Sequence, residues 1–170
     1  MEIDVNNLPE LLSSILTEAS PNERVLSVYL DTSPDQVSDT AYLLEFRDLA
    51  KSLRERLPEN ERKPFEATRE QAEAYLHSEV TFRWPGLALF ATGSSTYFHV
   101  AALPTPPIGE MVWDSLPIVQ PLVRAIEETA RTCVALFDAR EARLLTFRLG
   151  RIEERRSLRD DVAGKQRGGG

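Results

Sequence analysis

The sequence contains few of the residues that several classes of protein require. Its single cysteine, Cys133, excludes an internal disulfide and any cysteine-cluster metal site. The two histidines, His77 and His99, sit outside any Cys, His or Asp-Glu cluster at ligand spacing, so we expect no bound metal. No apolar run approaches the ~20 residues that span a bilayer.

Two further absences concern targeting and cofactors. The first residues, Met1-Glu-Ile-Asp4, lack the basic start and the apolar stretch of a signal peptide. The glycines before residue 150 are isolated, so neither a Walker A nor a dinucleotide-binding fingerprint is present. We therefore expect a cytoplasmic protein without a cofactor or a membrane partner.

The charge is acidic overall but unevenly placed. The 170 residues have a net charge of −7. Residues 1–130 hold 10 basic and 21 acidic side chains, a net charge of −11, whereas residues 131–170 hold 10 basic and 6 acidic, a net charge of +4. This shift predicts two domains with different partners, the first over 1–130 and the second over 131–170.

Residues 1–130 show the mixture of helical and strand patterns that is typical of an α/β fold. Apolar residues at helical spacing predict helices over about 8–20, 40–57, 64–78 and 118–129. Apolar and β-branched runs between turn formers predict strands over 25–30, 86–91, 96–103 and 111–113. The charged residues 59–63 are expected to be a solvated connection. We expect these elements to form a layered, mixed β-sheet with helices packed against it.

Residues 131–170 predict a different arrangement. Strands are expected as a three-strand antiparallel meander over 132–138, 142–149 and 152–158, with the charged last strand at an edge. The first strand is expected to be buried, with Cys133 as a small core residue. The meander has one apolar face and no helix of its own to cover it, as in the front of an incomplete second domain. A cationic, glycine-rich loop is expected to follow over 159–170.

Two segments are candidate binding sites from their residues alone. Asp31-Thr-Ser-Pro34 follows a buried strand, where open α/β sheets bind ligands, although a strand-capping turn explains it as well and is the interpretation we favour. The tail Gly164-Lys-Gln-Arg-Gly-Gly-Gly170 combines glycines that let backbone N–H groups approach a phosphate with the charges of Lys165 and Arg167. Gln166 adds an amide that both donates and accepts hydrogen bonds. A solvated terminus or a linker explains this tail equally well.

A third basic group lies around the end of the second predicted helix. It comprises Arg54, Arg56, Arg62 and Lys63. Glutamates are interleaved with these cations, so the pattern favours a solvated helix face over a binding site.

Several motifs in this order resemble a known family. They are Val25-Leu-Ser-Val-Tyr-Leu-Asp-Thr32, Pro85-Gly-Leu-Ala-Leu-Phe90, the strand Thr132-Cys-Val-Ala-Leu-Phe-Asp138 after a helix, and Ala142-Arg-Leu-Leu-Thr-Phe147 leading through Gly150 to the basic glycine loop. The combination resembles the archaeo-eukaryotic peptide-chain release factor superfamily. It is more closely similar to the bacterial release-factor-like branch, which includes ribosome hibernation and rescue factors.

The resemblance implies an amino-terminal domain over 1–130 and the start of a middle domain over 131–170. In the family the middle domain carries a Gly-Gly-Gln loop into the peptidyl-transferase centre. The residues at its place here are the loop candidates Gln166, Gly168, Gly169 and Gly170, preceded by Arg167. The third position is Gly170 rather than glutamine, and Gln166 lies on the other side, so no catalytic residue is assigned. We expect no enzymatic activity of this chain alone, and peptidyl-tRNA hydrolysis by a longer protein only if a glutamine follows.

The resemblance also implies partners and contact residues. The family's stop-codon motifs, Asn-Ile-Lys-Ser and Tyr-x-Cys, are absent, so decoding of stop codons is not expected. The chain is expected to bind the ribosomal A site, contacting ribosomal RNA and the tRNA acceptor end, with a translation GTPase as a candidate delivery factor and no role on DNA. The residues expected to contact RNA phosphates are Arg148, Arg151, Arg155, Arg156, Lys165 and Arg167.

One alternative belongs to another functional class. The charge of −11 in the first domain also suits an α/β protein-interaction or small-ligand module with no RNA role. The placement of the basic residues of 131–167 discriminates, because scattered cations favour the module and cations along one face favour RNA.

Overall fold

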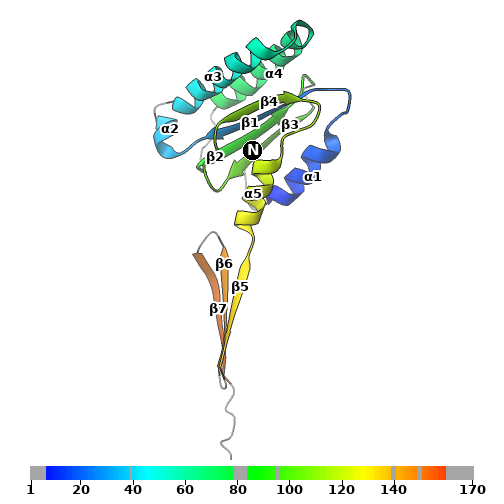
Figure 1. Ribbon diagram of the computed structural model, residues 1–170. Helices are drawn as coiled ribbons and strands as arrows, with labels where there is room; N and C mark the ends of the chain where they lie inside the picture. The colour runs from blue at the N-terminus through cyan, green and yellow to red at the C-terminus, as the bar shows by residue number, and fades with distance from the viewer. Residues whose placement is uncertain are drawn as a thin grey trace, which may run out of the picture. The chain divides into compact units, whose positions relative to one another are not determined.

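The computed structural model describes residues 7–38, 40–78, 84–94, 96–138, 141–148 and 151–159. The chain divides into two compact units, Met1–Glu128 and Thr129–Gly170. Figure 1 shows the helices and strands of each unit.

The first unit is built on a four-stranded sheet in the order β3-β2-β1-β4. Its strands are β1 (Val25–Asp31), β2 (Gly86–Ala91), β3 (Phe98–Leu103) and β4 (Glu110–Asp114). Every ladder in it is antiparallel, so the expected mixed sheet is wrong in strand direction, while the α/β class is confirmed. Two long helices separate β1 from β2 and return the chain to the sheet end where β1 finishes, which places Gly86 beside Asp31. An even number of long elements between neighbouring strands makes them antiparallel.

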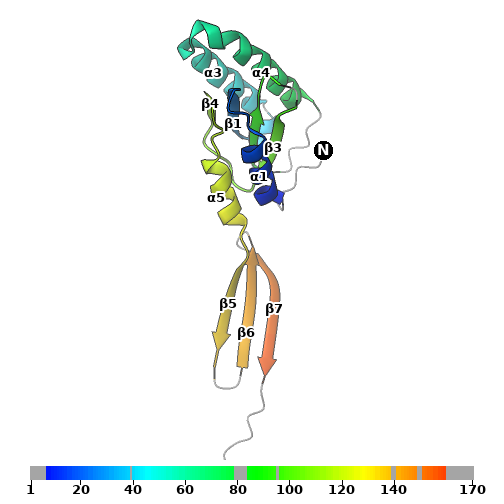
Figure 2. The same cartoon turned by 90° about the vertical axis from the view of Figure 1, so that its right-hand side faces the viewer.

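Helices cover both faces of this sheet (Figures 1 and 2). The long helices α3 (Ala41–Arg56) and α4 (Glu59–His77) pack on one face, and α1 (Leu8–Glu18) and α5 (Gln120–Thr129) pack on the other. Successive residues of β1 therefore enter different cores: Leu26 and Val28 face α3 and α4, whereas Tyr29 faces α1 and α5. Burial on both faces explains why apolar residues lie on both sides of β1, with Ser27 as its one buried polar residue.

The charged residues 59–63 are helical, which corrects the predicted solvated connection. Helix α4 begins at Glu59, directly after Pro58, and Glu59 and Glu61 lie in its first turn, where carboxylates stabilise the helix dipole. Arg62 Nη1 pairs with Glu59 Oε2 at 2.7 Å, one turn away. Pro64 forgoes one helical hydrogen bond, and the burial of Phe65 directly after it offsets that loss.

The Asp31 segment also differs in detail from the predicted loop. A short helix, α2 (Pro34–Ser38), follows β1 after two residues. Asp31 Oδ1 accepts hydrogen bonds from the backbone N–H and the hydroxyl of Ser33, at 2.8 and 2.5 Å. The aspartate therefore caps the turn that leads into α2.

The second unit is a three-stranded antiparallel sheet in the order β5-β6-β7, as predicted. Its strands are β5 (Thr132–Phe137), β6 (Glu141–Arg148) and β7 (Arg151–Arg159). The prediction of a buried first strand is wrong, because all of β5 is exposed, Cys133 included. Apolar side chains lie on both faces, with Leu136 on one and Phe137 on the other, and no described helix of this unit covers either face.

Candidate nucleic-acid interface

Four of the arginines expected to bind RNA lie where β6 ends and β7 begins and in the middle of β7. The backbone register pairs Arg148, at the end of β6, with Arg151, at the start of β7. Arg155 and Arg156 lie in the middle of β7 and are exposed. The other predicted residues lie outside the described residues: Lys165 and Arg167, with the loop candidates Gln166, Gly168, Gly169 and Gly170.

Arg155 and Arg156 do not share a face of the sheet. Consecutive strand residues point to opposite faces. The register places Arg155 opposite Leu145 and Arg156 opposite Leu144, two neighbours that also alternate. A nucleic-acid strand lying on one face therefore meets one of these two guanidinium groups on β7.

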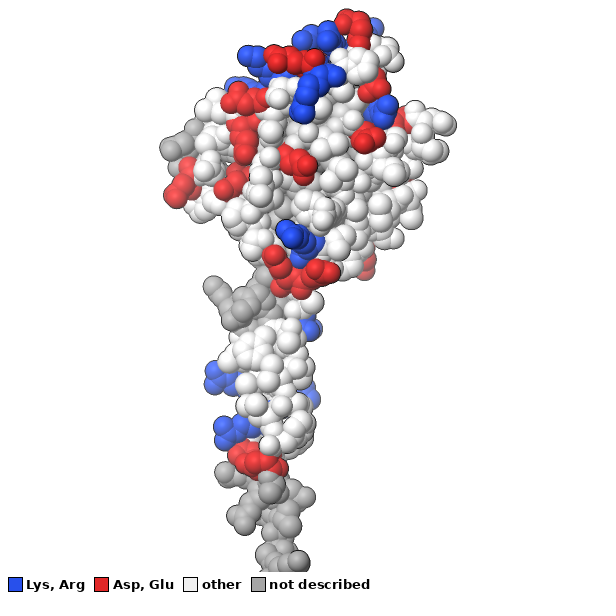
Figure 3. Space-filling view, in the orientation of Figure 1, with Lys and Arg blue, Asp and Glu red and all other residues white. Residues whose placement is uncertain are grey.

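Two other cations of this unit are paired with carboxylates in the described residues. Arg131 Nε lies 3.0 Å from Glu153 Oε2. Arg143 makes a bidentate contact with Glu141: its Nε lies 3.0 Å from Oε1 and its Nη2 lies 3.1 Å from Oε2. This contact raises the pKa of the Arg143 guanidinium. Arg155 has no ion-pair partner among the residues that the structure describes. Figure 3 shows cations spread over the second unit with uncharged surface between several of them. Arg155 is thus the candidate here with its donors open to a phosphate.

A larger group of cations lies on the α3–α4 hairpin of the first unit. Residues 41–77 hold seven of the ten basic residues of 1–130. Figure 3 shows them gathered over these helices, interleaved with acidic side chains. Arg54 pairs with Glu66 and Arg62 with Glu59, so the interleaving seen in the sequence becomes direct ion pairing. Arg47 and Arg69 join this pairing through Glu73, which sequence reasoning had not singled out.

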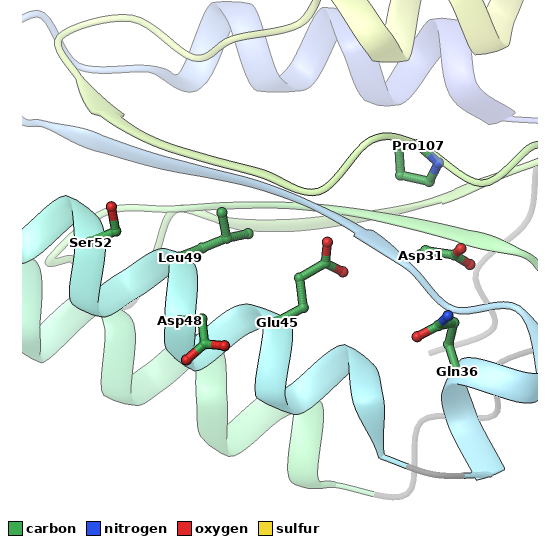
Figure 4. A pocket seen from close by; sticks show the side chains of 7 residues that line it. All are labelled: Asp31, Gln36, Glu45, Asp48, Leu49, Ser52 and Pro107. Carbon is green, nitrogen blue, oxygen red and sulfur yellow. The ribbon is translucent and has the colours of Figure 1, made fainter.

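A hollow of about 570 Å³ lies at the carboxyl end of β1 (Figure 4). It is lined by Asp31, Gln36, Glu45, Asp48, Leu49, Ser52 and Pro107. Burial, and then the negative charge of Asp31, raise the pKa of the Glu45 carboxyl. Gly109 lets this carboxylate lie close to the backbone, because a methyl group there would overlap it. Three carboxylates repel an anionic ligand, so this hollow does not extend a nucleic-acid interface.

The two histidines lie on different elements. His77, on α4, has Nε2 3.1 Å from Arg47 Nη2, and His99, on β3, has Nε2 3.1 Å from Glu18 Oε2. Within the described part of the chain no three His, Cys, Asp or Glu side chains are grouped as metal ligands. None of the described helices is both long and apolar enough to cross a membrane.

One similarity to known proteins lies in the segment that begins just before α5 and runs to the end of the sequence. Residues 117–170 match the model of the family described as bacterial archaeo-eukaryotic release factor family 10. The chain resembles the bacterial archaeo-eukaryotic release factors. The prediction made from the ordered strand motifs is thereby confirmed.

Solved structures agree with the release-factor-like resemblance at the level of the fold. A structure described as an archaeal protein superposes with a TM-score of 0.52 and 18% identity, over 98% of this chain and 48% of that one. The crystal structure of the archaeal translation termination factor aRF1 gives 0.51 and 16%, over 90% of this chain and 44% of that one. The chain thus spans less than half the length of either structure. No curated protein sequence matches it.

Proposed function

We propose that the chain acts in translation as a release-factor-like protein that binds ribosomal RNA in the A site. The observation that carries the proposal is the match of residues 117–170 to a release-factor family, because this segment includes the whole basic part of the sequence. The fold shared with aRF1 supports the same assignment for the first unit.

The two parts of the chain take different roles in this proposal. Residues 1–130 act as the amino-terminal domain and face the decoding region. Residues 131–170 act as the start of the middle domain and direct the glycine tail toward the tRNA acceptor end. The role is hibernation, rescue or a termination-like step without stop-codon decoding, since the decoding motifs are absent from the sequence.

Co-sedimentation of the protein with 70S ribosomes over a range of salt concentrations tests this proposal. We expect association at low salt that weakens as salt rises, because phosphate contacts release counterions. Arg155→Glu should weaken it about tenfold, as expected for one lost charge-assisted contact. The matched control is Arg124→Glu, an equal charge reversal at an exposed position of α5. Absence of association at low salt would refute the proposal.

Peptidyl-tRNA hydrolysis is a separate activity within the same functional class. Its test is release of an ester-linked peptide from tRNA on ribosomes, compared before and after substitution of the glycines at 168–170. Release that persists after substitution would show that this loop does not carry the reaction.

A second candidate function, a small-ligand or protein-interaction module, is favoured by the acidic hollow beside β1. Its carboxylates, Asp31, Glu45 and Asp48, suit a cationic group such as an amine or an arginine side chain. Asp48→Asn would weaken binding of such a partner and leave ribosome association unchanged. If Asp48→Asn leaves the binding of such a partner unchanged and weakens ribosome association, the result favours the ribosomal function.

A further inference from the structure

The outer surface of the α3–α4 hairpin differs in charge from the rest of its unit. Residues 41–77 hold seven basic and eight acidic side chains, a net charge of −1. The rest of 1–130 holds three basic and thirteen acidic side chains, a net charge of −10. If the first unit touches a polyanion, this hairpin is the part where repulsion is weakest.

An alternating chain of ion pairs joins the two helices. Arg54 Nε lies 2.7 Å from Glu66 Oε1, and the other oxygen of Glu66 lies 2.7 Å from Arg69 Nε. Arg69 Nη1 pairs in turn with Glu73, whose second oxygen lies 2.6 Å from Arg47 Nε. Both oxygens of each glutamate are therefore engaged, and three guanidinium groups share two carboxylates. The Arg47 and Arg69 contacts hold the pKa of the Glu73 carboxyl below its usual range.

The two carboxylates in this series of ion pairs are less exposed than Arg47 and Arg54, the arginines at its two ends. The side chains of Glu73 and Glu66 are 18% and 30% exposed, whereas those of Arg47 and Arg54 are 50% and 51% exposed. A molecule that approaches the hairpin therefore meets guanidinium groups first. Both outer arginines bind their glutamates through Nε, and the two Nη groups of Arg54 have no partner among the described residues.

The cations surround a hollow of about 280 Å³ between the helices. Its lining is Arg47, Ala50, Lys51, Arg54, Glu66 and Arg69, which brings four positive charges and one negative charge together. Lys51 is exposed and has no ion-pair partner in the described part of the chain. Arg47, Lys51 and Arg54 follow the i, i+4, i+7 spacing of one helix face, a row about 10 Å long.

We propose that the hollow lined by Arg47, Lys51 and Arg54 binds the phosphate backbone of RNA. Guanidinium forks bind phosphate oxygens in pairs, and a row of cations matches the repeated charges of a nucleic-acid strand. The ion-pair chain fixes the arginines before binding, which lowers the entropic cost of ordering them. This inference rests on the proposed function only for identifying the RNA as ribosomal. An acidic protein is the competing partner, and the test below separates the two.

Substitution of Lys51 tests RNA binding by the hollow most directly. Lys51→Glu reverses one charge in the hollow without breaking an ion pair of the hairpin, and Arg54→Gln removes the open guanidinium. Lys63→Glu is the matched control, because Lys63 is exposed on the same hairpin and does not line the hollow. Thermal melts of all variants establish that the fold is kept.

Binding is measured with two probes, 70S ribosomes and a short labelled single-stranded RNA, each over a range of salt. We expect Lys51→Glu and Arg54→Gln each to weaken binding about tenfold and to lower the slope of log K against log salt by about 0.7, the share of one phosphate on a single strand. The Lys63→Glu control should stay within about twofold of the wild type.

The outcomes separate this inference from the proposed function. Ribosome binding that is unaffected by Lys51→Glu overturns the hollow and leaves the ribosomal function standing. Loss of RNA binding in that variant, in a protein that does not sediment with ribosomes, overturns the ribosomal function and supports the hollow. The proposal for the hollow is also overturned if the wild-type protein does not bind the RNA. It is likewise overturned if polyglutamate displaces the RNA at a lower concentration than unlabelled RNA does.

Discussion

Gly86, the first residue of β2, packs closely against the loop that follows β3. A β-carbon there would lie 2.6 Å from the Thr105 carbonyl oxygen and 2.7 Å from Pro107 Cδ. These atoms belong to the stiff proline loop after β3 and cannot swing away as a flexible side chain would. Glycine at the start of β2 is therefore required by packing.

Gly86→Ala should lower the free energy of unfolding by about 1–3 kcal/mol, the usual cost of overpacking. Gly93→Ala is the matched control, since its added carbon would find its nearest neighbour, Thr68 Oγ1, 3.9 Å away. Urea titration of both variants makes the comparison. Equal stability of the two variants would contradict the packing argument.

The buried hydroxyl of Tyr97 predicts a loss of stability in alkali. It donates a hydrogen bond to the Ile15 carbonyl at 2.9 Å, and burial, followed by the charge of Glu18, raises its pKa to about 12. An unfolded tyrosine titrates near pH 10, so the native state keeps its proton where the unfolded state loses it. The stabilisation is complete below about pH 10 and is lost as the pH rises toward about 12.

Tyr97→Phe should cost about 1–2 kcal/mol at neutral pH, because the Ile15 carbonyl loses its donor. Above about pH 10 its stability should fall less steeply than that of the wild type. Part of the slope should remain, since burial also raises the pKa of Tyr29. Unfolding titrations at several alkaline pH values measure both slopes, and parallel slopes would show that Tyr97 does not titrate in the unfolding transition.

Single residues show clearly where sequence patterns stop predicting. The local spacing of Asp31 and Ser33 suffices to predict a capping turn, and that turn is present. The ion pairing of Arg47 with Glu73 could not be predicted, because it depends on how two helices pack across 26 positions of sequence. The prediction that Cys133 is a core residue was wrong for a similar reason. The composition of a strand indicates that it can enter a core but does not say what covers it.

At the scale of elements, Pro64 is the weak point of α4. Proline in a helix interior costs about 3 kcal/mol relative to alanine in exposed model helices. Pro64→Ala restores one backbone donor and should raise the free energy of unfolding by about 1–2 kcal/mol. The control is Pro58→Ala, where the residue precedes the helix and no gain is expected. A thermal melt that shows equal midpoints for Pro64→Ala and the wild type would contradict this.

Element existence followed closely from the sequence, and element ends less so. The run Val25–Leu30 is mostly apolar and buried throughout, and the two covered faces of the sheet account for this. The start of α4 was missed because two prolines flank a charged segment, a pattern that also suits a connection. The all-antiparallel pairing of the first sheet was missed because it depends on which strands are neighbours as well as on the number of helices between them.

At the scale of the whole molecule, the two units differ in how well their strands are buried. Residues of β2 are buried throughout, whereas those of β5 are exposed throughout. We expect amides of β1 and β2 to exchange hydrogen about 100-fold more slowly than those of β5, because exposed strands open locally at low cost. Hydrogen exchange followed by mass spectrometry measures this, and uniform protection along the chain would contradict it.

The net charge of residues 1–130 does not show where their charges lie on the surface. The value of −11 for residues 1–130 argued against RNA, yet most of their cations are concentrated on one hairpin. Composition gives the sum of the charges, and only the packing of α3 on α4 shows which sign lies outermost. The cations of 131–167, whose placement along one face would favour RNA, include two neighbours on opposite faces of β7.

The paired arrangement of α3 and α4 would allow the hairpin to change in length without a change in the sheet. Whole turns added to both helices at their junction, Leu57-Pro58, would move that junction outward by about 5.4 Å per turn. The sheet would keep its register, since the chain would still leave after Asp31 and return at Gly86. Related proteins with longer or shorter hairpins would then touch surfaces at different distances while sharing one unchanged core.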